Sequence, residues 1–340
     1  MRSLLARRSK RTLVTVQIAL VFAIAAGLAL IPILDERSFN LQRITFYLLW
    51  YAILASSWNM IGGYAGQTSF GHAAFLGMGA YVTGILWSQA KLNPLIALPI
   101  GGLVSAGYGV LVGIPTLRLR GPYFAIATIG IGEATRLFAT NFDDIFGVTL
   151  TKGVTGISLG GPSMPNLDPV VVHYATIVVF VLVMLTTMWI RGGRFGLGLF
   201  ALNMDRDAAE TVGVPTARLQ VLALAVSAFF AASAGGLYAI RQQFLDPASM
   251  FGFDKSIAVV LMPVVGGIGT VWGPIFGAIL YSTVQDQLTR VIVNNPYLPS
   301  LIYGILLVVI VMFEPLGIAG VVGRTSAYMR KLVSPKDGEP

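Results

Sequence analysis

The stretch 191–219 carries the most distinctive pattern of polar and charged residues in the chain. Asp205 can accept hydrogen bonds from the first turn of a helix, and two further acidic residues place negative charge near the helix N-terminus. Gly213 suits the left-handed position after a helix, and Pro215 prevents the helix from continuing. The pattern predicts a short capped helix, which is either a knob for the groove of another protein or a connector that only caps itself. The residues that could make such a contact are Asp207, Ala208, Ala209, Glu210 and Gly213.

A second stretch, 61–75, places glycine, amide, hydroxyl and imidazole groups in front of an apolar run. Ser69 is available as the N-cap of the helix that follows. A broken segment that ends at a helix N-terminus can offer free N–H groups to a carboxylate, so Gln67, Ser69 and His72 could line a path or an inner gate. The alternative is a tight turn in which His72 is a hydrogen-bonded structural residue.

Polar groups inside apolar segments are the remaining candidates. Ser56 and Asn59 lie three residues apart on one helical face, where they could line a polar path or bond a neighbouring helix. Glu133 and Arg136 have the same spacing well inside another segment. An ionisable residue within a membrane is a functional hypothesis by default. This pair is therefore either part of a passage or its outer gate, or an ion pair that satisfies itself within one helix.

Several kinds of catalytic site are missing from the sequence. The absence of cysteine excludes disulfides, thiolate metal sites and cysteine-based catalysis. His72 and His173 are far apart and fit no metal-ligand spacing. The chain has neither a GxxxxGK[ST] phosphate loop nor a GxSxG nucleophile elbow. We therefore expect no enzymatic activity and no cofactor bound by this chain.

The composition places these groups within a membrane protein. Of the 340 residues, 55% are hydrophobic and only 11% are charged, whereas about a quarter of a soluble domain is charged. The net charge of +8 is confined to a few loops, which is typical of cytoplasmic loops and not of a face that binds nucleic acid. The expected fold class is an all-α polytopic membrane protein.

Ten apolar segments approach the length needed to cross a bilayer. They occupy residues 13–34, 44–62, 71–90, 94–114, 121–140, 170–190, 217–240, 256–268, 272–292 and 298–316. Because 256–268 is short and ends in a glycine-rich stretch, eight spans plus a helical hairpin are the alternative. Ten crossings with both termini in the cytoplasm place 15 of the 23 basic residues inside, in agreement with the positive-inside rule.

This topology divides the chain into a basic cytoplasmic N-terminus (1–11), a transmembrane domain (12–316) and a cytoplasmic tail (317–340). The first apolar run is too long for a signal peptide, so we expect a retained span. The transmembrane domain includes a cytoplasmic loop (191–218) and a periplasmic loop (141–169). The stretch 61–75 then lies near the cytoplasmic end of its span.

Small residues at four-residue spacing predict where these helices pack, since lipid offers no hydrophobic driving force for their association. Two long stripes and one short stripe have this spacing: Gly101, Ser105, Gly109 and Gly113; Ser227, Ala231, Gly235 and Ala239; and Gly273 with Gly277.

Five motifs carry a resemblance to a known family. They are GYAGQTSFGHAAFLGMGAY at 63–81, LRLRGPYFAIAT at 117–128, a Thr-x-Gly-x-x-Gly-Ile pattern at 151–157, GRFG at 193–196 leading into DAAxxxG at 207–213, and VGGIGTVWGPIFGA at 265–278. Together they resemble permease subunits of bacterial branched-chain amino-acid ABC importers, in the LivM branch.

The resemblance implies a function and a set of partners. In such permeases an acidic-Ala-Ala-x3-Gly loop forms the coupling helix that docks on the ATPase, a role that falls here to Asp207, Ala208, Ala209 and Gly213. Asp replaces the usual Glu, and the closing Pro is absent. The implied partners are a sister permease, two cytoplasmic ATPases that bind ATP and Mg, and a periplasmic binding protein. The implied location is the bacterial inner membrane, and the implied cargo is Leu, Ile or Val.

Two other functions remain as alternatives. Close relatives of this family carry urea or short amides. A self-sufficient secondary carrier or channel would need an intramembrane carboxylate to bind a coupling ion. Glu133 and Asp286 are the strong candidates, and each has a basic neighbour, Arg136 and Arg290 respectively.

Overall fold

The computed structural model describes residues 2–34, 39–141, 144–145, 148–149, 155–159 and 167–291, together with scattered positions between 298 and 320. The predicted segment 298–316 and the C-terminal tail lie mostly outside the described residues, and the loop 141–169 is described only in part.

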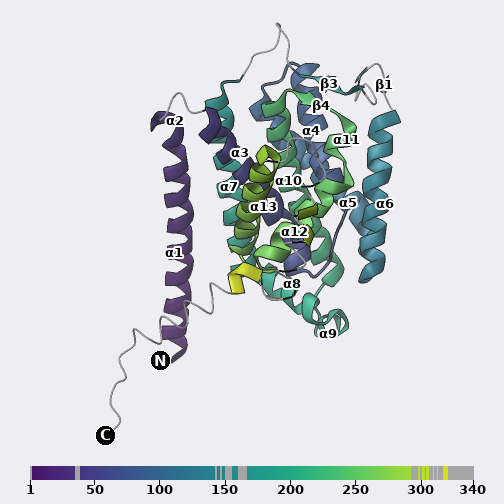
Figure 1. Ribbon diagram of the computed structural model, residues 1–340. Helices are drawn as coiled ribbons and strands as arrows, with labels where there is room; N and C mark the ends of the chain where they lie inside the picture. Colours follow the sequence, from purple (N-terminus) through teal and green to yellow (C-terminus); the bar gives the residue numbers. More distant parts are fainter. Residues whose placement is uncertain are drawn as a thin grey trace.

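Long helices dominate the described chain, and their bounds follow the apolar segments (Figure 1). The helices are α1 (Arg2–Ala29), α2 (Ile31–Leu34), α3 (Phe39–Asn59), the π-helical turn η1 (Met60–Tyr64), α4 (His72–Ser88), α5 (Pro94–Thr116), α6 (Pro122–Asn141), α7 (Pro169–Gly192), α8 (Arg194–Met204), α9 (Arg206–Thr211), α10 (Thr216–Gln242), α11 (Pro247–Met250), α12 (Phe253–Gly266) and α13 (Gly273–Val291). Nine of the ten predicted segments coincide with helices, and the tenth is the segment that lies mostly outside the description. By length and composition, six of the helices among the described residues are suited to crossing a membrane.

The two ends of the bundle differ in structure. At one end lie two small antiparallel pairs of strands (Figure 1). Strand β1 (Asp144–Ile145) pairs with β2 (Val148–Thr149), and β3 (Ile157–Ser158) pairs with β4 (Phe244–Leu245). The other end carries α8 and α9. These are called the strand end and the α9 end.

The centre of the bundle is the packing of α4, α5 and α10, where the predicted small-residue stripes meet. A Cβ atom added at Gly235 of α10 would lie 1.9 Å from the carbonyl oxygen of Leu76 in α4. A Cβ atom at Gly109 of α5 would lie 3.0 Å from Cβ of Ala228. These backbones approach so closely because the residues between them are small, which confirms the predicted seams.

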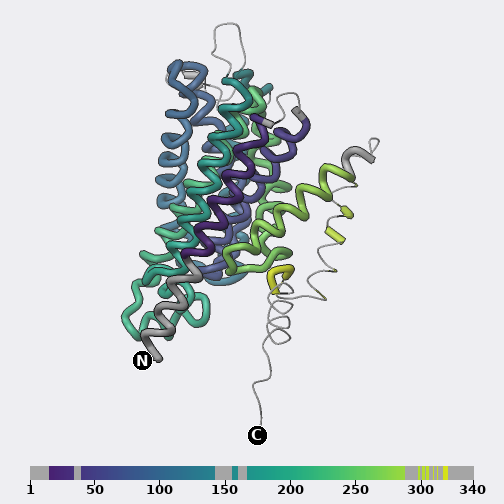
Figure 2. Tube along the Cα trace, turned by 90° about the vertical axis from the view of Figure 1, so that its left-hand side faces the viewer, coloured from purple at the N-terminus to yellow at the C-terminus, as the bar shows by residue number. Residues whose placement is uncertain are grey.

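The short stripe, Gly273 with Gly277, lies in the contact between α12 and α13. A Cβ atom at Gly277 would lie 1.8 Å from the carbonyl oxygen of Met262, and one at Gly266 would lie 1.8 Å from that of Gly273. The two helices therefore cross in backbone contact. Figure 2 shows α13 running obliquely to the longer helices.

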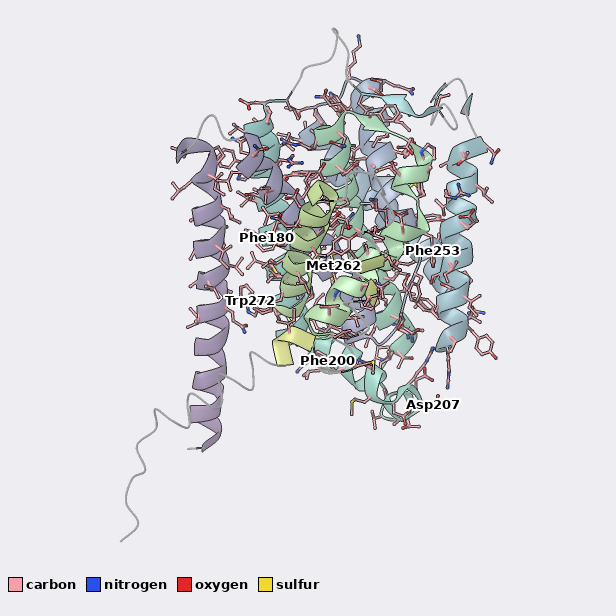
Figure 3. All side chains as sticks on the ribbon, viewed as in Figure 1. Phe180, Phe200, Asp207, Phe253, Met262 and Trp272 are labelled. Carbon is pink, nitrogen blue, oxygen red and sulfur yellow. The ribbon has the colours of Figure 1, made fainter. Side chains whose placement is uncertain are left out.

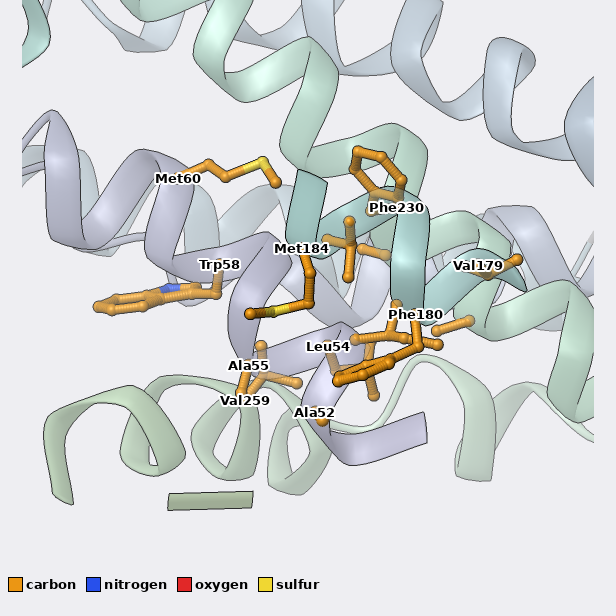
Figure 4. Close-up of a cluster of buried hydrophobic side chains, with 14 of the residues drawn as sticks. Ala52, Leu54, Ala55, Trp58, Met60, Val179, Phe180, Met184, Phe230 and Val259 are labelled. Atoms are coloured by element: carbon orange, nitrogen blue, oxygen red, sulfur yellow. The ribbon is translucent and has the colours of Figure 1, made fainter. Parts of the chain in front are cut away.

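A cluster of buried aromatic, aliphatic and methionine side chains fills the space between α3, α7, α10 and α12 (Figure 4). Trp58, Phe180 and Met184 lie at its centre and are buried. Trp50, one of the largest buried side chains, also donates its indole N–H to the carbonyl of Ala234 at 2.8 Å, which ties α3 to α10.

Helices α1 and α6 stand at opposite edges of the bundle (Figure 1). Two side chains of α7 hold the strand end of α1: His173 Nε2 lies 3.0 Å from the Leu28 carbonyl, and the Tyr174 hydroxyl donates to Ala29 at 3.2 Å. Helix α6 packs against the starts of α4 and α12, and much of its remaining surface is exposed.

Candidate functional site

The short helix α9 lies at the tip of the molecule, where Figure 3 labels Asp207. Asp205 Oδ1 accepts the backbone N–H groups of Asp207 at 2.9 Å and Ala208 at 3.0 Å, which is the geometry of an N-cap. Gly213 follows the helix with φ +84°, a left-handed conformation that favours glycine. The predicted capped helix is therefore confirmed.

Two arginines fix α9 to the connection between α5 and α6. Arg120, in that connection, donates from Nη1 and Nη2 to the two carboxylate oxygens of Asp207 at 3.0 and 2.8 Å. This guanidinium holds the pKa of the Asp207 carboxyl below its ordinary value. Arg206 donates to Glu210 Oε1 and to the Leu117 carbonyl, both at 3.1 Å. The first two residues of α9 are thus both bonded to the connection between α5 and α6.

The connection from α9 into α10 is also hydrogen-bonded. The hydroxyl of Thr216, the first residue of α10, donates to the Glu210 carboxylate. Hydrogen bonds from Thr216 and Arg206 lower the pKa of Glu210, so its carboxylate stays charged. Ala209 is buried against the bundle, whereas Ala208 is exposed.

The exposed residues of α9 are mixed in character, since Asp207, Glu210 and Thr211 are exposed beside Ala208. Two large apolar side chains flank the helix: Met204, the last residue of α8, is 89% exposed, and Val212, which follows α9, is 78% exposed. The geometry fits both predicted alternatives, the docking knob and the connector that caps itself.

The second candidate region is the break between α3 and α4. Helix α3 passes into the buried π-helical turn η1, a form often found at functional sites. The chain then reverses, with Gly66 at φ +70°, and α4 begins at His72. The indole N–H of Trp58 donates to the carbonyl of Ser69 at 2.7 Å, and the backbone N–H of Gln67 donates to Ile61 at 3.1 Å.

The break runs from the α9 end into the bundle, and at its start Asn203 of α8 donates from Nδ2 to the Gly63 carbonyl at 3.3 Å. His72 Nε2 lies 2.8 Å from the hydroxyl of Ser227, which stands near the middle of α10. At 1.5 Å per residue, Ser227 is about 16 Å along the axis from the start of that helix. The expectation that the stretch lies near one end of its span holds for residues 63–66, which contact α8, and fails for His72, because the chain turns back towards the centre after Gly66.

The expected N-cap is also wrong. The cap position of α4 is Gly71, and Ser69 lies before it, with its hydroxyl 3.4 Å from the Gly71 nitrogen. A Cβ atom at Gly71 would lie 2.6 Å from the carbonyl oxygen of Thr128 in α6. The close approach of α6 therefore requires glycine at residue 71, the N-cap position, for which the side chain of Ser69 was expected.

His72 is buried and hydrogen-bonded on both ring nitrogens. The hydroxyl of Ser227 donates to the Ser57 carbonyl at 2.6 Å, so its lone pair accepts the N–H of His72 Nε2. The other nitrogen, Nδ1, then accepts from the Ser69 hydroxyl at 3.2 Å. A neutral imidazole satisfies this chain of bonds, which links α3, α4 and α10.

Asn59 joins the two glycine-rich stretches. Its Oδ1 accepts the N–H of Gly269, and its Nδ2 donates to the carbonyl of Thr270, both at 2.9 Å. Asn59 was predicted either to line a polar path or to bond a neighbouring helix, and these contacts fit the second alternative, a bond to a neighbouring segment.

Ser56 is fully buried, and its hydroxyl has no hydrogen-bond partner among the described residues.

Glu133 and Asp286, the two carboxylates predicted to lie within the membrane, each lie beside an arginine. Arg136 donates from Nε and Nη2 to the two oxygens of Glu133 at 2.9 and 2.5 Å, within α6. Asp286 Oδ1 lies 3.7 Å from Arg43 Nη2 of α3. The expected neighbour of Asp286, Arg290, has a side chain outside the described part of the chain.

Sequence reasoning missed several groups that hold these regions. Arg120 clamps α9, the Thr128 hydroxyl accepts the N–H of Phe70 at 3.0 Å, and the Ser256 hydroxyl accepts the N–H of Ala73 at 3.0 Å. The only sequence feature that pointed to the contact with α9 was the positive charge of Arg120 in a loop. The two hydroxyls bond backbone groups 58 and 183 residues away, which no local pattern reveals.

Comparison with known proteins assigns the chain to a family. Residues 40–311 match the family described as the permease component of branched-chain amino acid transport systems. The chain belongs to this family. The match begins at α3, so it includes the break, α6 and α9, and it leaves α1 outside.

The chain is also similar to named permeases of branched-chain amino acid transport systems. The chain is 33% identical over 292 residues to the high-affinity permease protein LivM of Salmonella typhimurium, and 34% identical over 297 residues to LivM of Escherichia coli. Each alignment covers 79% of this chain and 67% of the relative. LivH of Escherichia coli is 26% identical over 293 residues, which cover 79% of this chain and 91% of LivH. No solved structure matches the chain.

Proposed function

We propose that this chain is the permease subunit of a binding-protein-dependent ABC importer that carries Leu, Ile and Val across the bacterial inner membrane. Membership of the permease family and the names of the LivM and LivH relatives support this function. The partners we propose are a LivH-like sister permease, two cytoplasmic ATPases and a periplasmic binding protein. The proposed topology has ten membrane segments with both termini in the cytoplasm.

The observation that carries the proposal is the way α9 is held. The helix exposes Ala208 between the exposed side chains of Met204 and Val212, while Arg120, Arg206 and Thr216 fasten α9 to the connection between α5 and α6 and to α10. Helix α10 in turn packs backbone-to-backbone against α4 at Gly235. A push on α9 is therefore transmitted through α10 to the break at His72.

The proposed cycle uses this connection. When the two ATPases close on ATP, they move α9, and the bundle switches the passage between inward-facing and outward-facing arrangements. ATP and Mg bind to the ATPases, and this chain makes no covalent change to the cargo. The strand end of the bundle, with the loop 141–169, is the proposed surface for the binding protein.

A self-sufficient carrier finds less support. A coupling ion would need a carboxylate free to bind it. Glu133 and Asp286 each lie beside an arginine, Arg136 and Arg43.

Ala208→Arg tests the proposed function. A large cation on the exposed surface of α9 should abolish ATP-driven uptake of leucine and co-purification with the ATPase. Because Ala208 is exposed, the bundle itself should still insert and fold. The matched control is Ala248→Arg, an exposed alanine on α11 at the strand end, which should leave ATPase co-purification intact. Normal uptake and normal co-purification in the Ala208 variant would refute the docking role of α9.

A further inference from the structure

A cavity of about 310 Å³ lies where α4, α6 and α12 meet. The rings of Phe70, Phe251 and Phe253 line one part of it, and Gly132 and Glu133 of α6 line another. The rings of Phe70 and Phe253 are 6.4 Å apart. This volume lies at the lower end of the range for small-molecule sites, which are mostly apolar with a few polar groups.

The cavity lies at the depth of the break, because two helices begin there. The Ser256 hydroxyl, in the first turn of α12, accepts the N–H of Ala73, in the first turn of α4. The Thr128 hydroxyl of α6 accepts the N–H of Phe70. Since His72 contacts the middle of α10, this junction lies near the middle of the bundle.

Glu133 lines the cavity, and its partner Arg136 lies one helical turn along α6, outside the set of residues that line it. Glu133 and Arg136 bond each other within α6, and among the described residues their side chains hydrogen-bond to no second helix. Their side chains are 49% and 31% exposed. A charged pair at this depth is unfavourable in lipid and marks a substrate pathway by default.

The pair also has a specific chemical form. It presents one negative and one positive group side by side, with no net charge. A free amino acid at neutral pH presents the same two charges on groups bonded to one carbon atom, an ammonium and a carboxylate, also with no net charge.

Resting on the proposed function, we propose that this cavity binds the transported amino acid as a zwitterion. The ammonium pairs with Glu133, the carboxylate pairs with Arg136, and the branched side chain lies among the phenylalanine rings. No charge is left unpaired in this arrangement. A solute with an additional charge would bury that charge without a partner, which opposes its binding.

Thiol labelling tests occupancy directly, because the chain has no cysteine. The variant Gly132→Cys places a thiol in the cavity, where its Cβ would lie 3.6 Å from Cα of Gly71, its nearest described neighbour. The matched control is Gly130→Cys, two residues away on α6, whose Cβ would have no described neighbour within 4 Å. If Gly132→Cys blocks transport, Phe253→Cys takes its place.

The labelling is measured in the complete reconstituted complex during ATP turnover, with this chain resolved by mass. At ten times the half-saturating concentration of leucine, the labelling rate at position 132 should fall about ten-fold, as mass action requires. The rate at position 130 should not change. Equal rates at position 132 with and without leucine, in a complex that accumulates leucine, would overturn the proposal.

Three charge variants test zwitterion recognition. Glu133→Gln and Arg136→Gln should each raise the half-saturating leucine concentration about ten-fold, while ATP hydrolysis stimulated by the binding protein stays normal. The double variant Glu133→Gln/Arg136→Gln is neutral but lacks both contacts, so its uptake should stay impaired. Recovery of wild-type uptake in the double variant would show that only neutrality matters and would overturn the proposal. A wild-type complex that does not accumulate leucine would instead refute the proposed function, before any variant is made.

Discussion

The closest backbone contact between α4 and α10 gives a prediction whose size follows from the structure. Gly235→Ala adds a methyl carbon 1.9 Å from the carbonyl oxygen of Leu76 and 2.9 Å from the nitrogen of Ala80. Real Cβ contacts are essentially never shorter than 3.0 Å, so the two helices must separate by at least 1.1 Å, the difference between 3.0 and 1.9 Å. Both clashing atoms are backbone, so no side chain can move aside.

Separation on this scale removes much of the packing along the seam. A gap of about 0.5–1 Å already forfeits a quarter to a half of each van der Waals contact. Overpacking of this kind reduces the free energy of unfolding by about 3 kcal/mol, and the better helix propensity of alanine offsets about 1 kcal/mol. We therefore expect a net loss of about 2 kcal/mol and a decrease in Tm of about 4 °C or more.

Thermal unfolding of the purified chain in detergent, followed by the fraction that stays monodisperse, measures this change. Gly107→Ala is the matched control, since a Cβ at Gly107 of α5 meets no described atom within 4 Å. The control should be neutral or more stable by up to about 1 kcal/mol. An unchanged or raised Tm for Gly235→Ala would show that the backbones of α4 and α10 are farther apart at Gly235 than in this structure.

Two further predictions concern the loops. Asn59→Ala leaves the N–H of Gly269 and the carbonyl of Thr270 unpaired, so the free energy of unfolding should fall by about 2–4 kcal/mol in the same thermal assay; a Tm equal to that of the unmodified chain would argue against these bonds. Arg120 lowers the pKa of the Asp207 carboxyl below its ordinary value of about 4. The Asp207 carboxylate therefore stays charged and bonded to Arg120 above about pH 4, and this ion pair is lost only as the pH falls through the lowered pKa. ATPase co-purification should therefore be constant between pH 8 and pH 5, and a loss centred between pH 6 and pH 7 would contradict this account.

Local patterns were enough to predict the parts of the fold that depend on neighbouring residues. The cap at Asp205, the turn at Gly213 and the ion pair of Glu133 with Arg136 all involve residues within four positions of each other. The small-residue stripes also predicted the seam at Gly235, because close packing in a membrane needs small residues at a fixed spacing.

Long-range contacts account for what the sequence could not predict. An apolar pattern cannot distinguish a turn at the end of a span from a chain that re-enters the bundle, so the depth of His72 was placed wrongly. The partner of Asp207 is Arg120, 87 residues earlier. The partner found for Asp286 is Arg43, on another helix, and not the residue at four-position spacing. The cavity at Glu133 exists only because the starts of α4 and α12 meet beside α6.

Accumulation of labelled leucine in sealed vesicles is the most direct measurement of the central claim, that partner ATPases drive this chain through α9. Vesicles that contain this chain, its sister permease, both ATPases and the binding protein should concentrate leucine when ATP reaches the ATPases. Vesicles that contain the same permeases without ATPases should not exceed equilibration. Accumulation against a gradient by the ATPase-free vesicles would contradict the account.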